Sequence, residues 1–345
     1  KIPSWPVTPV IRIFSSIIYL VFISLNSNYI IKSFRVKIYI NKINENWVVD
    51  RLKKEWIKNN KDINTKSLMR SDIIWIIAPW TWEKINIKYL QSKPVVCSMY
   101  HIENQKLDQL YLDNFRKLDN YVDEYLTISN KSKEQIRSLT DKKITSIPFW
   151  VNQNIFFYID KKIELRKSLG FNRNDYLLGS FQRDSEGQDT SKPKMIKGPD
   201  RFLEIAKHLN STKENLVVVL TGKRRDYLVN ELSKAGIKFK VLEMINFKKL
   251  NQLYNVLDLY VVSSRVEGGP QAILECSITK TPIISTDVGV SSEILSSKSI
   301  FNMENFKDKV PDTEYAYTNS LKYTIPNGMN TFREFFQNFN QKSNA

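Results

Sequence analysis

The chain has 345 residues, 42% of them hydrophobic, with 10 glycines and 12 prolines. This composition excludes a disordered chain and a fibrous repeat, and the length favours two domains over one. The formal net charge is +16, from 52 basic and 36 acidic residues. Residues 1–150 hold 24 basic and 14 acidic residues, a net +10. The first half is therefore the better candidate to meet an anionic surface or substrate.

Cysteine and histidine are both rare. Cys97 and Cys276 lie far apart in the sequence, which argues against a disulfide scaffold and suits a reducing compartment. His101 and His208 are the two histidines of the chain, so we do not expect a histidine-based metal site.

The longest apolar run is IFSSIIYLVFISL, residues 13–25. A membrane-spanning helix needs about 20 apolar residues, so this run is short for that role. No small-residue cleavage site follows it, as a signal peptide would require. Two interpretations stay open: a helix lying in the membrane interface, and a helix packed on the protein. We set residues 1–34 apart as an apolar and basic N-terminal segment.

From residue 35 onward, short apolar runs alternate with amphipathic stretches. A strand is predicted at 36–40, and a helix begins near Trp47, with Val48, Leu52 and Trp56 on one face. Further strands are predicted at 73–77, 94–98, 125–129 and 144–147, and further helices at 105–118 and 131–139. Strands separated by helices indicate βαβ units and a parallel sheet. We assign residues 35–152 to a first Rossmann-like domain.

A second alternating series follows the segment PFWVNQNIFFYID. The run at 216–220 contains only Val and Leu, as expected of a strand covered on both faces. The other strands are predicted at 177–182, 239–243, 259–263 and 282–286, and the helices at 201–209, 227–235, 248–256 and 271–278. Residues 153–325 form the second domain of this prediction. Residues 326–345 form a C-terminal helix that we expect to pack back on the first domain. The fold class is α/β, with two doubly wound domains facing across a cleft.

The stretch with the clearest chemistry is SSRVEGGPQAILECSITKTPIISTDVG, residues 263–289. It follows a buried strand, so Glu267, Gly268 and Gly269 lie at the carboxyl end of a strand. A helix beginning near Gln271 presents free N–H groups and a partial positive charge, which suits a diphosphate. Glu275 comes eight positions after Glu267, so both carboxylates can face one ligand. Carboxylates beside a phosphate site need hydroxyl partners, and the hydroxyls of a sugar are the natural ones.

The block EGGPQAILE resembles the Glu–seven residues–Glu pattern of retaining glycosyltransferases of the GT-B fold, family 4 in particular (glycosyl transferases group 1). TPIISTDVGVSSEIL, and YVDEYLTISNKSKEQI followed by ITSIPFWVN, are similar to other blocks of that family. GSFQRD followed by IKGPDRFLEIAKHL resembles its phosphate-binding segment. The resemblance covers about residues 95–295 and is strongest over 177–295. The ordered series of blocks is more specific than any one of them.

The resemblance implies a role for each matching residue. Arg183 and Lys197 would contact the donor diphosphate, and Glu275 would hold the ribose hydroxyls. Glu267 would bind the donor sugar, beside the backbone of Gly268, Gly269 and Gln271. His101 matches the family's histidine in the cleft, so His101 and Glu267 are the candidate catalytic residues. The implied activity is transfer of a sugar, of the hexosyltransferase type, from a nucleotide sugar with retained configuration, without a metal or other cofactor.

The expected acceptor is a polysaccharide or a lipid-linked glycan. The expected place is the cytoplasm, with peripheral contact at the anionic inner face of the membrane, because the first domain is basic and the N-terminal run is apolar. Two other functions stay open: a sugar-nucleotide epimerase on the same fold, and a basic binding protein without catalysis. No nucleic-acid recognition motif is found, so nucleic acid is not an expected partner.

Overall fold

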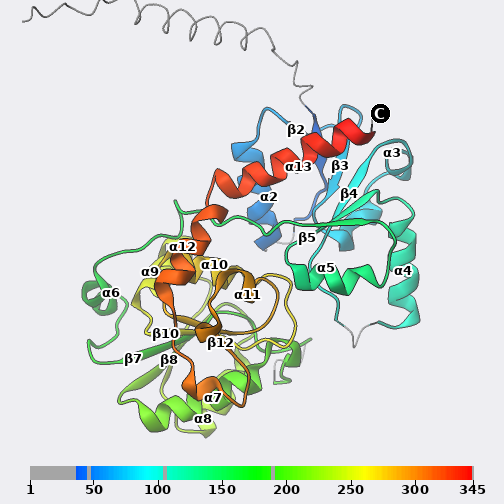
Figure 1. Ribbon diagram of the computed structural model, residues 1–345. Helices are drawn as coiled ribbons and strands as arrows, with labels where there is room; N and C mark the ends of the chain where they lie inside the picture. The colour runs from blue at the N-terminus through cyan, green and yellow to red at the C-terminus, as the bar shows by residue number, and fades with distance from the viewer. Residues whose placement is uncertain (1–35, 45–47, 104–106, 188–190, 344–345) are drawn as a thin grey trace, which may run out of the picture.

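The computed structural model describes residues 36–44, 48–103, 107–187 and 191–343. The apolar run at 13–25 and Trp47 lie outside the described residues. Within the described part, no helix is both long enough and apolar enough to cross a membrane. The chain forms two parallel six-stranded sheets flanked by helices (Figure 1), which confirms the predicted fold class.

The first sheet has the strand order β2-β1-β3-β4-β5-β6. Helices α2 (Val48–Asn59) and α13 (Asn327–Ser343) cover one face, and α3 (Ile87–Ser92), α4 (Gln109–Asp119) and α5 (Asn130–Arg137) cover the other. Neighbouring strand residues alternate between the two apolar layers, as the period of two requires. The strands are β1 (Ile38–Ile40), β2 (Asn64–Thr65), β3 (Ile73–Ile76), β4 (Val95–Met99), β5 (Glu124–Thr127) and β6 (Lys143–Ser146).

The second sheet has the order β12-β11-β10-β7-β8-β9. Its strands are β7 (Tyr176–Ser180), β8 (Leu216–Thr221), β9 (Phe239–Leu242), β10 (Leu259–Val262), β11 (Ile283–Thr286) and β12 (Ile300–Phe301). Helices α7 (Pro199–Thr212) and α8 (Asp226–Lys234) pack on one face, and α9 (Phe247–Val256) and α10 (Gln271–Ile278) pack on the other. Shorter helices complete this part: α6 (Lys162–Ser168), α11 (Ser291–Ile294) and α12 (Thr313–Ser320).

The C-terminal helix α13 lies across the first domain beside α2 (Figure 1). Phe332 and Phe336, four residues apart on one helix face, are fully buried there. The Trp75 ring of β3 lies 5.6 Å from Phe332 and 5.0 Å from Phe336, between ring centroids. Trp56 of α2 lies 6.1 and 6.0 Å from the same two rings. The last helix of the chain is therefore part of the first domain's core.

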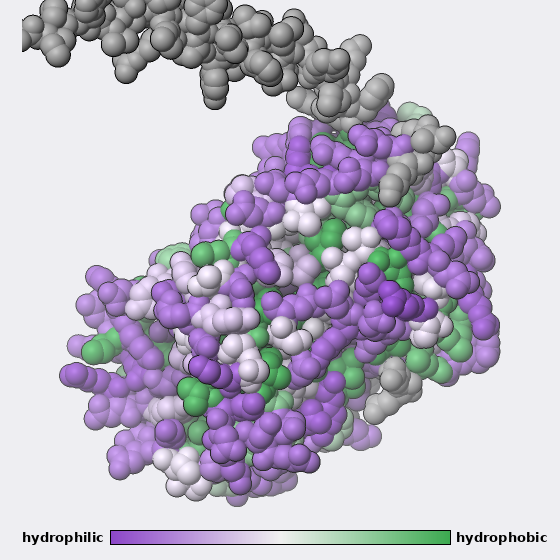
Figure 2. All heavy atoms as spheres, in the orientation of Figure 1, coloured by the Kyte–Doolittle hydropathy of each residue, from purple (hydrophilic) through white to green (hydrophobic). Residues whose placement is uncertain are grey.

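The chain crosses between the two parts of the molecule twice, and the two crossings touch. The Val151 backbone N–H donates to the Tyr323 carbonyl at 2.9 Å. The Gln153 side chain bonds the backbone of Ile325, accepting from its N–H at 3.0 Å and donating to its carbonyl. Polar side chains cover most of the outer face seen in Figure 2, and apolar ones form small scattered groups.

The predicted strands and helices are all found, with ends shifted by up to four residues. The helix at 271–278 has the predicted bounds. In the described part of the chain, the sequence analysis missed the 3₁₀ helices, the two-residue strands β2 and β12, and the helices α3, α6, α11 and α12. Most of these elements are too short to show a hydrophobic period. The eight-residue helix α12 buries only Ala316 and Ser320 and so shows no apolar face.

Candidate functional site

A cavity of about 920 Å³ lies between the two sheets. Its second-domain wall comes from the carboxyl ends of strands β7, β8 and β10 and from helices α9 and α10. Its first-domain wall includes α2, the segment after β3, the end of β4 and helix α4. Of the residues proposed from the sequence, His101, Lys197, Glu267, Gly268, Gly269, Gln271 and Glu275 line it.

The loop between β10 and α10 forms the centre of the cavity wall. Helix α10 begins at Gln271 with Pro270 as its capping residue, so the free N–H groups of its first turn face the loop. Ser263, at the end of β10, donates to the Gly198 carbonyl at 2.8 Å. That contact joins the loop to the segment before α7, where Gly198 has a φ of +62°, a conformation that favours glycine.

Glycine is required at position 268 by the approach of the first domain. A Cβ at Gly268 would lie 2.1 Å from the carbonyl oxygen of Tyr100, which follows β4. A Cβ at Gly269 would lie 3.0 Å from the Ile128 side chain, also of the first domain. From the sequence we expected the donor sugar beside the backbone of these glycines. The structure shows that the first domain also approaches them closely.

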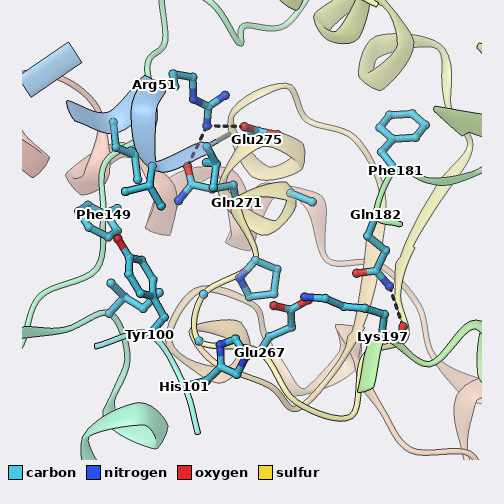
Figure 3. Close-up of a pocket in the computed structure, with 18 of the residues that line it drawn as sticks. Arg51, Tyr100, His101, Phe149, Phe181, Gln182, Lys197, Glu267, Gln271 and Glu275 are labelled. Atoms are coloured by element: carbon cyan, nitrogen blue, oxygen red, sulfur yellow. Dashed lines mark hydrogen bonds and ion pairs between the residues drawn. The ribbon is translucent and has the colours of Figure 1, made fainter. Parts of the chain in front are cut away.

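Lys197 and Glu267 form an ion pair at the cavity wall (Figure 3). The side chains are 19% and 12% exposed, so the pair is partly withdrawn from water. Ser264 donates to the same carboxylate oxygen of Glu267 at 3.2 Å. Gln182 donates to the Lys197 carbonyl at 2.8 Å and so fixes the backbone that carries the lysine. The arrangement places one cation and one carboxylate side by side where a charged ligand could separate them.

Both carboxylate oxygens of Glu275 have protein partners. Oε2 accepts from the Tyr254 hydroxyl at 2.8 Å. Oε1 accepts from Nη2 of Arg51, on helix α2 of the first domain, at 2.9 Å. Burial, and next the charge of Glu275, raises the pKa of Tyr254 well above its ordinary value, so the phenol stays a hydrogen-bond donor. Each carboxylate oxygen can accept a second bond, so Glu275 can still take ligand hydroxyls.

His101 follows β4 and lies beside Glu267 in the cavity (Figure 3). Its Nε2 is 3.7 Å from the Glu103 carboxylate. Burial lowers the pKa of His101 below 6.5, against the opposing effect of Glu267. The imidazole is therefore neutral at neutral pH, able both to donate and to accept a hydrogen bond.

The lowered pKa of His101 predicts that the free energy of unfolding changes with pH. Between the lowered folded pKa and the unfolded value near 6.5, the unfolded chain binds the proton and the folded chain does not. Wild-type stability should therefore fall as the pH drops below 6.5, by up to about 1.4 kcal/mol per pH unit from this group. In His101→Asn that component should vanish, and in His208→Asn it should remain. Unfolding measured between about pH 5 and 8 checks this; equal pH profiles for wild type and His101→Asn would refute it.

Arg183 is placed differently from its neighbours. Its side chain is exposed, and it is not among the residues that line the cavity. The two residues before it, Phe181 and Gln182, line the cavity instead.

Arg51, Gln182 and Tyr254 bond other residues of this site, and the sequence analysis named none of them. Arg51 lies on a helix whose pattern indicated only an apolar face, and its partner is 224 residues away. The pattern of α9 predicts Tyr254 only as a core residue, and its ring is indeed buried. No local pattern distinguishes these residues from ordinary surface or core positions.

The first-domain wall of the cavity is largely apolar. Trp80 and Trp82 come from the 3₁₀ segment Pro79–Lys84, and Tyr111, Phe115 and Leu118 come from α4. The polar side chains on this wall include Arg51, Glu83, His101 and Asn114. Among the described residues, no group of three His, Cys, Asp or Glu side chains could hold a metal ion.

Comparison with known proteins agrees with the motifs. Residues 192–308 match the family described as glycosyl transferases group 1. The chain is 25% identical over 230 residues to an uncharacterized glycosyltransferase, MJ1607, of Methanocaldococcus jannaschii, a match covering 61% of this chain and 56% of that protein. It is 26% identical over 145 residues to the lipopolysaccharide core biosynthesis mannosyltransferase LpsB of Rhizobium meliloti, covering 40% and 39%. The matches thus span about half or less of the length of these relatives.

Solved structures share the whole architecture. Anabaena Alr3699/HepE, in complex with UDP and glucose, superposes with a TM-score of 0.67 at 13% identity, covering 88% of this chain and 99% of that one. Sucrose-phosphate synthase from Thermosynechococcus elongatus superposes with a TM-score of 0.61 at 12% identity, covering 87% and 81%. The resemblance inferred from the motifs is confirmed: the chain has the GT-B fold of the glycosyltransferases, and its second domain carries the glycosyl transferases group 1 segment.

Proposed function

We propose that this protein is a retaining glycosyltransferase that moves a sugar from a nucleotide-sugar donor to a polysaccharide or lipid-linked acceptor. The observation that carries the proposal is the meeting of Lys197, Glu267, Glu275 and the start of α10 in one interdomain cavity. The family match over residues 192–308 covers the same segment.

The second-domain wall suits a nucleotide sugar. Lys197 and the N–H groups at the start of α10 are donors for a diphosphate, whose negative charge grows as the sugar leaves. Glu275 would accept from the ribose hydroxyls, and Glu267 from hydroxyls of the transferred sugar. These basic and dipolar groups would take the place of a metal ion, so we propose that the reaction needs none. The UDP and glucose in the Anabaena structure support this type of donor.

The first-domain wall suits an acceptor with an apolar part. Trp80, Trp82 and Phe115 offer apolar surface against which the lipid part of a lipid-linked glycan can pack. Together with the basic first half of the chain, this supports action at the inner face of the cytoplasmic membrane. The mannosyltransferase of Rhizobium meliloti, named for lipopolysaccharide core synthesis, agrees with such an acceptor.

The donor assignment predicts nucleotide binding that depends on Glu275. Calorimetric titration with UDP, GDP and ADP should show binding of one of them, and Glu275→Ala should weaken it about 10- to 100-fold, the effect of losing bonds to a charged group. The matched control is Glu204→Ala, an exposed carboxylate on α7, which should leave binding unchanged. Binding of none of the three nucleotides would overturn the proposed function.

Product analysis distinguishes transfer from epimerisation. Incubation with the nucleotide sugar alone should leave the sugar nucleotide unchanged apart from slow hydrolysis, because transfer needs an acceptor. An isomerised sugar nucleotide would instead identify an epimerase. With an acceptor present, the anomeric configuration of the product, read by NMR, tests retention.

A further inference from the structure

Arg51 reaches from the first domain into the donor half of the cavity (Figure 3). Its Nη2 donates to Glu275 at 2.9 Å and to Gln271 at 3.1 Å, and both residues lie on the first two turns of α10. The guanidinium carbon lies 5.3 Å from the ring centres of Phe156 and of Phe247. All four of these partners belong to the second domain, so Arg51 is held by the domain opposite its own.

These contacts leave most of the guanidinium's donors unused. Arginine has five N–H donors, and the two bonds use only those on Nη2. Nε is buried without a hydrogen-bond partner, and Nη1 makes no hydrogen bond to any residue that the structure describes. The Arg51 side chain is 13% exposed and lines the cavity, so its remaining accessible surface faces that space. Unpaired donors on a cation withdrawn from water are costly unless a ligand satisfies them.

The surroundings indicate what that ligand carries. The guanidinium lies next to the start of α10, where free N–H groups already favour an anion. The donors on Nη1 remain for a phosphate oxygen, since Nη2 is bonded to α10 and Nε is buried. The guanidinium also neutralises Glu275, whose carboxylate would otherwise repel a diphosphate bound at the helix start. Arg51 therefore allows a diphosphate to bind at the start of α10 although the Glu275 carboxylate lies on the same helix.

We propose that Arg51 binds the diphosphate of the donor nucleotide when the two domains are closed, so that both domains build the donor site. This inference rests on the proposed function, since it specifies a contact of the same donor. It makes Arg51 a binding residue of the first domain and makes the closed arrangement a condition for full donor affinity.

The experiment compares binding of a nucleoside diphosphate with binding of the matching nucleoside. The diphosphate used is whichever of UDP, GDP and ADP the wild type binds most tightly, and the nucleoside is the one with the same base. Arg51→Met should weaken the diphosphate about 10- to 100-fold and leave the nucleoside within about twofold. Arg51→Lys should give an intermediate affinity, because lysine restores the charge without the planar fork. Lys54→Met, which removes an exposed cation of the same helix, should bind both ligands as the wild type does.

Salt dependence provides a second readout that a merely structural role would not change. Diphosphate affinity of the wild type should fall more steeply with ionic strength than that of Arg51→Met, because the variant has lost one cation facing the ligand. Thermal unfolding of each variant checks that the fold is kept.

The alternative outcomes each have a distinct meaning. Equal weakening of the nucleoside and the diphosphate would overturn the inference and leave Arg51 as a residue that only positions Glu275. Unchanged or tighter diphosphate binding in Arg51→Met would also overturn it. Arg51 would then only join the two domains through Glu275, in a contact that the donor breaks. In both cases the wild type still binds its nucleotide, so the proposed function stands. A wild type that binds none of the three nucleotides overturns both.

Discussion

Replacing Lys197 with methionine is expected to lower kcat/KM for sugar transfer by about 100- to 1,000-fold, the effect of removing one preorganised donor from a developing charge. Lys197 is the cation paired with Glu267 on the cavity wall, and its side chain is only 19% exposed. In such a partly dry site its charge would act strongly on the departing diphosphate of the proposed donor. The loss should be mainly in kcat, because the charge on the leaving group grows between the bound substrate and the transition state. Steady-state kinetics with the nucleotide sugar measure it.

Two further variants separate this role from general charge loss. Lys197→Arg keeps a cation and should recover part of the lost rate. Lys207→Met removes an exposed lysine from α7, the helix that follows Lys197, and should not change the kinetics. If Lys197→Met retained kcat/KM within about threefold, Lys197 would not stabilise the leaving group.

The second large effect is expected for Gly268→Val. Any Cβ at this position would lie 2.1 Å from the Tyr100 carbonyl oxygen, which is backbone and cannot rotate away. The substitution must therefore push apart the end of β4 and the β10–α10 loop, and with them His101 and Glu267. A displacement of about 1 Å between reacting groups costs about 100-fold in rate, so we expect a loss of at least that size in kcat/KM.

Gly236→Ala is the matched control. Gly236 has a left-handed φ of +64°, unlike Gly268, and a Cβ there would meet nothing within 4 Å. This change should cost about 1 kcal/mol of stability through backbone strain and leave transfer unchanged. Small-angle scattering should show a more open molecule for Gly268→Val alone. Wild-type activity in Gly268→Val would mean that the domains need not meet at this loop.

Much of the fold follows from local pattern in the sequence. Strands such as β8, a run of Val and Leu, are covered on both faces and read as continuous apolar segments. Helices such as α10 begin after a Gly-Gly-Pro turn that local chemistry predicts. The spacing of Glu267 and Glu275 around that turn also brought both to the cavity. These features depend on neighbours a few residues apart, so the sequence alone determined the two α/β domains and the main motif of the site.

The tertiary structure decided which distant groups meet. Arg51 reaches Glu275 across 224 residues, and the close approach of the first domain requires glycine at position 268. It also placed Gln182 on the cavity wall and left Arg183 exposed, a choice set by how the chain leaves β7. Such contacts depend on the packing of two domains against each other. No periodicity or spacing within a single element records that packing, because periodicity reports which face of an element is buried and not what covers it.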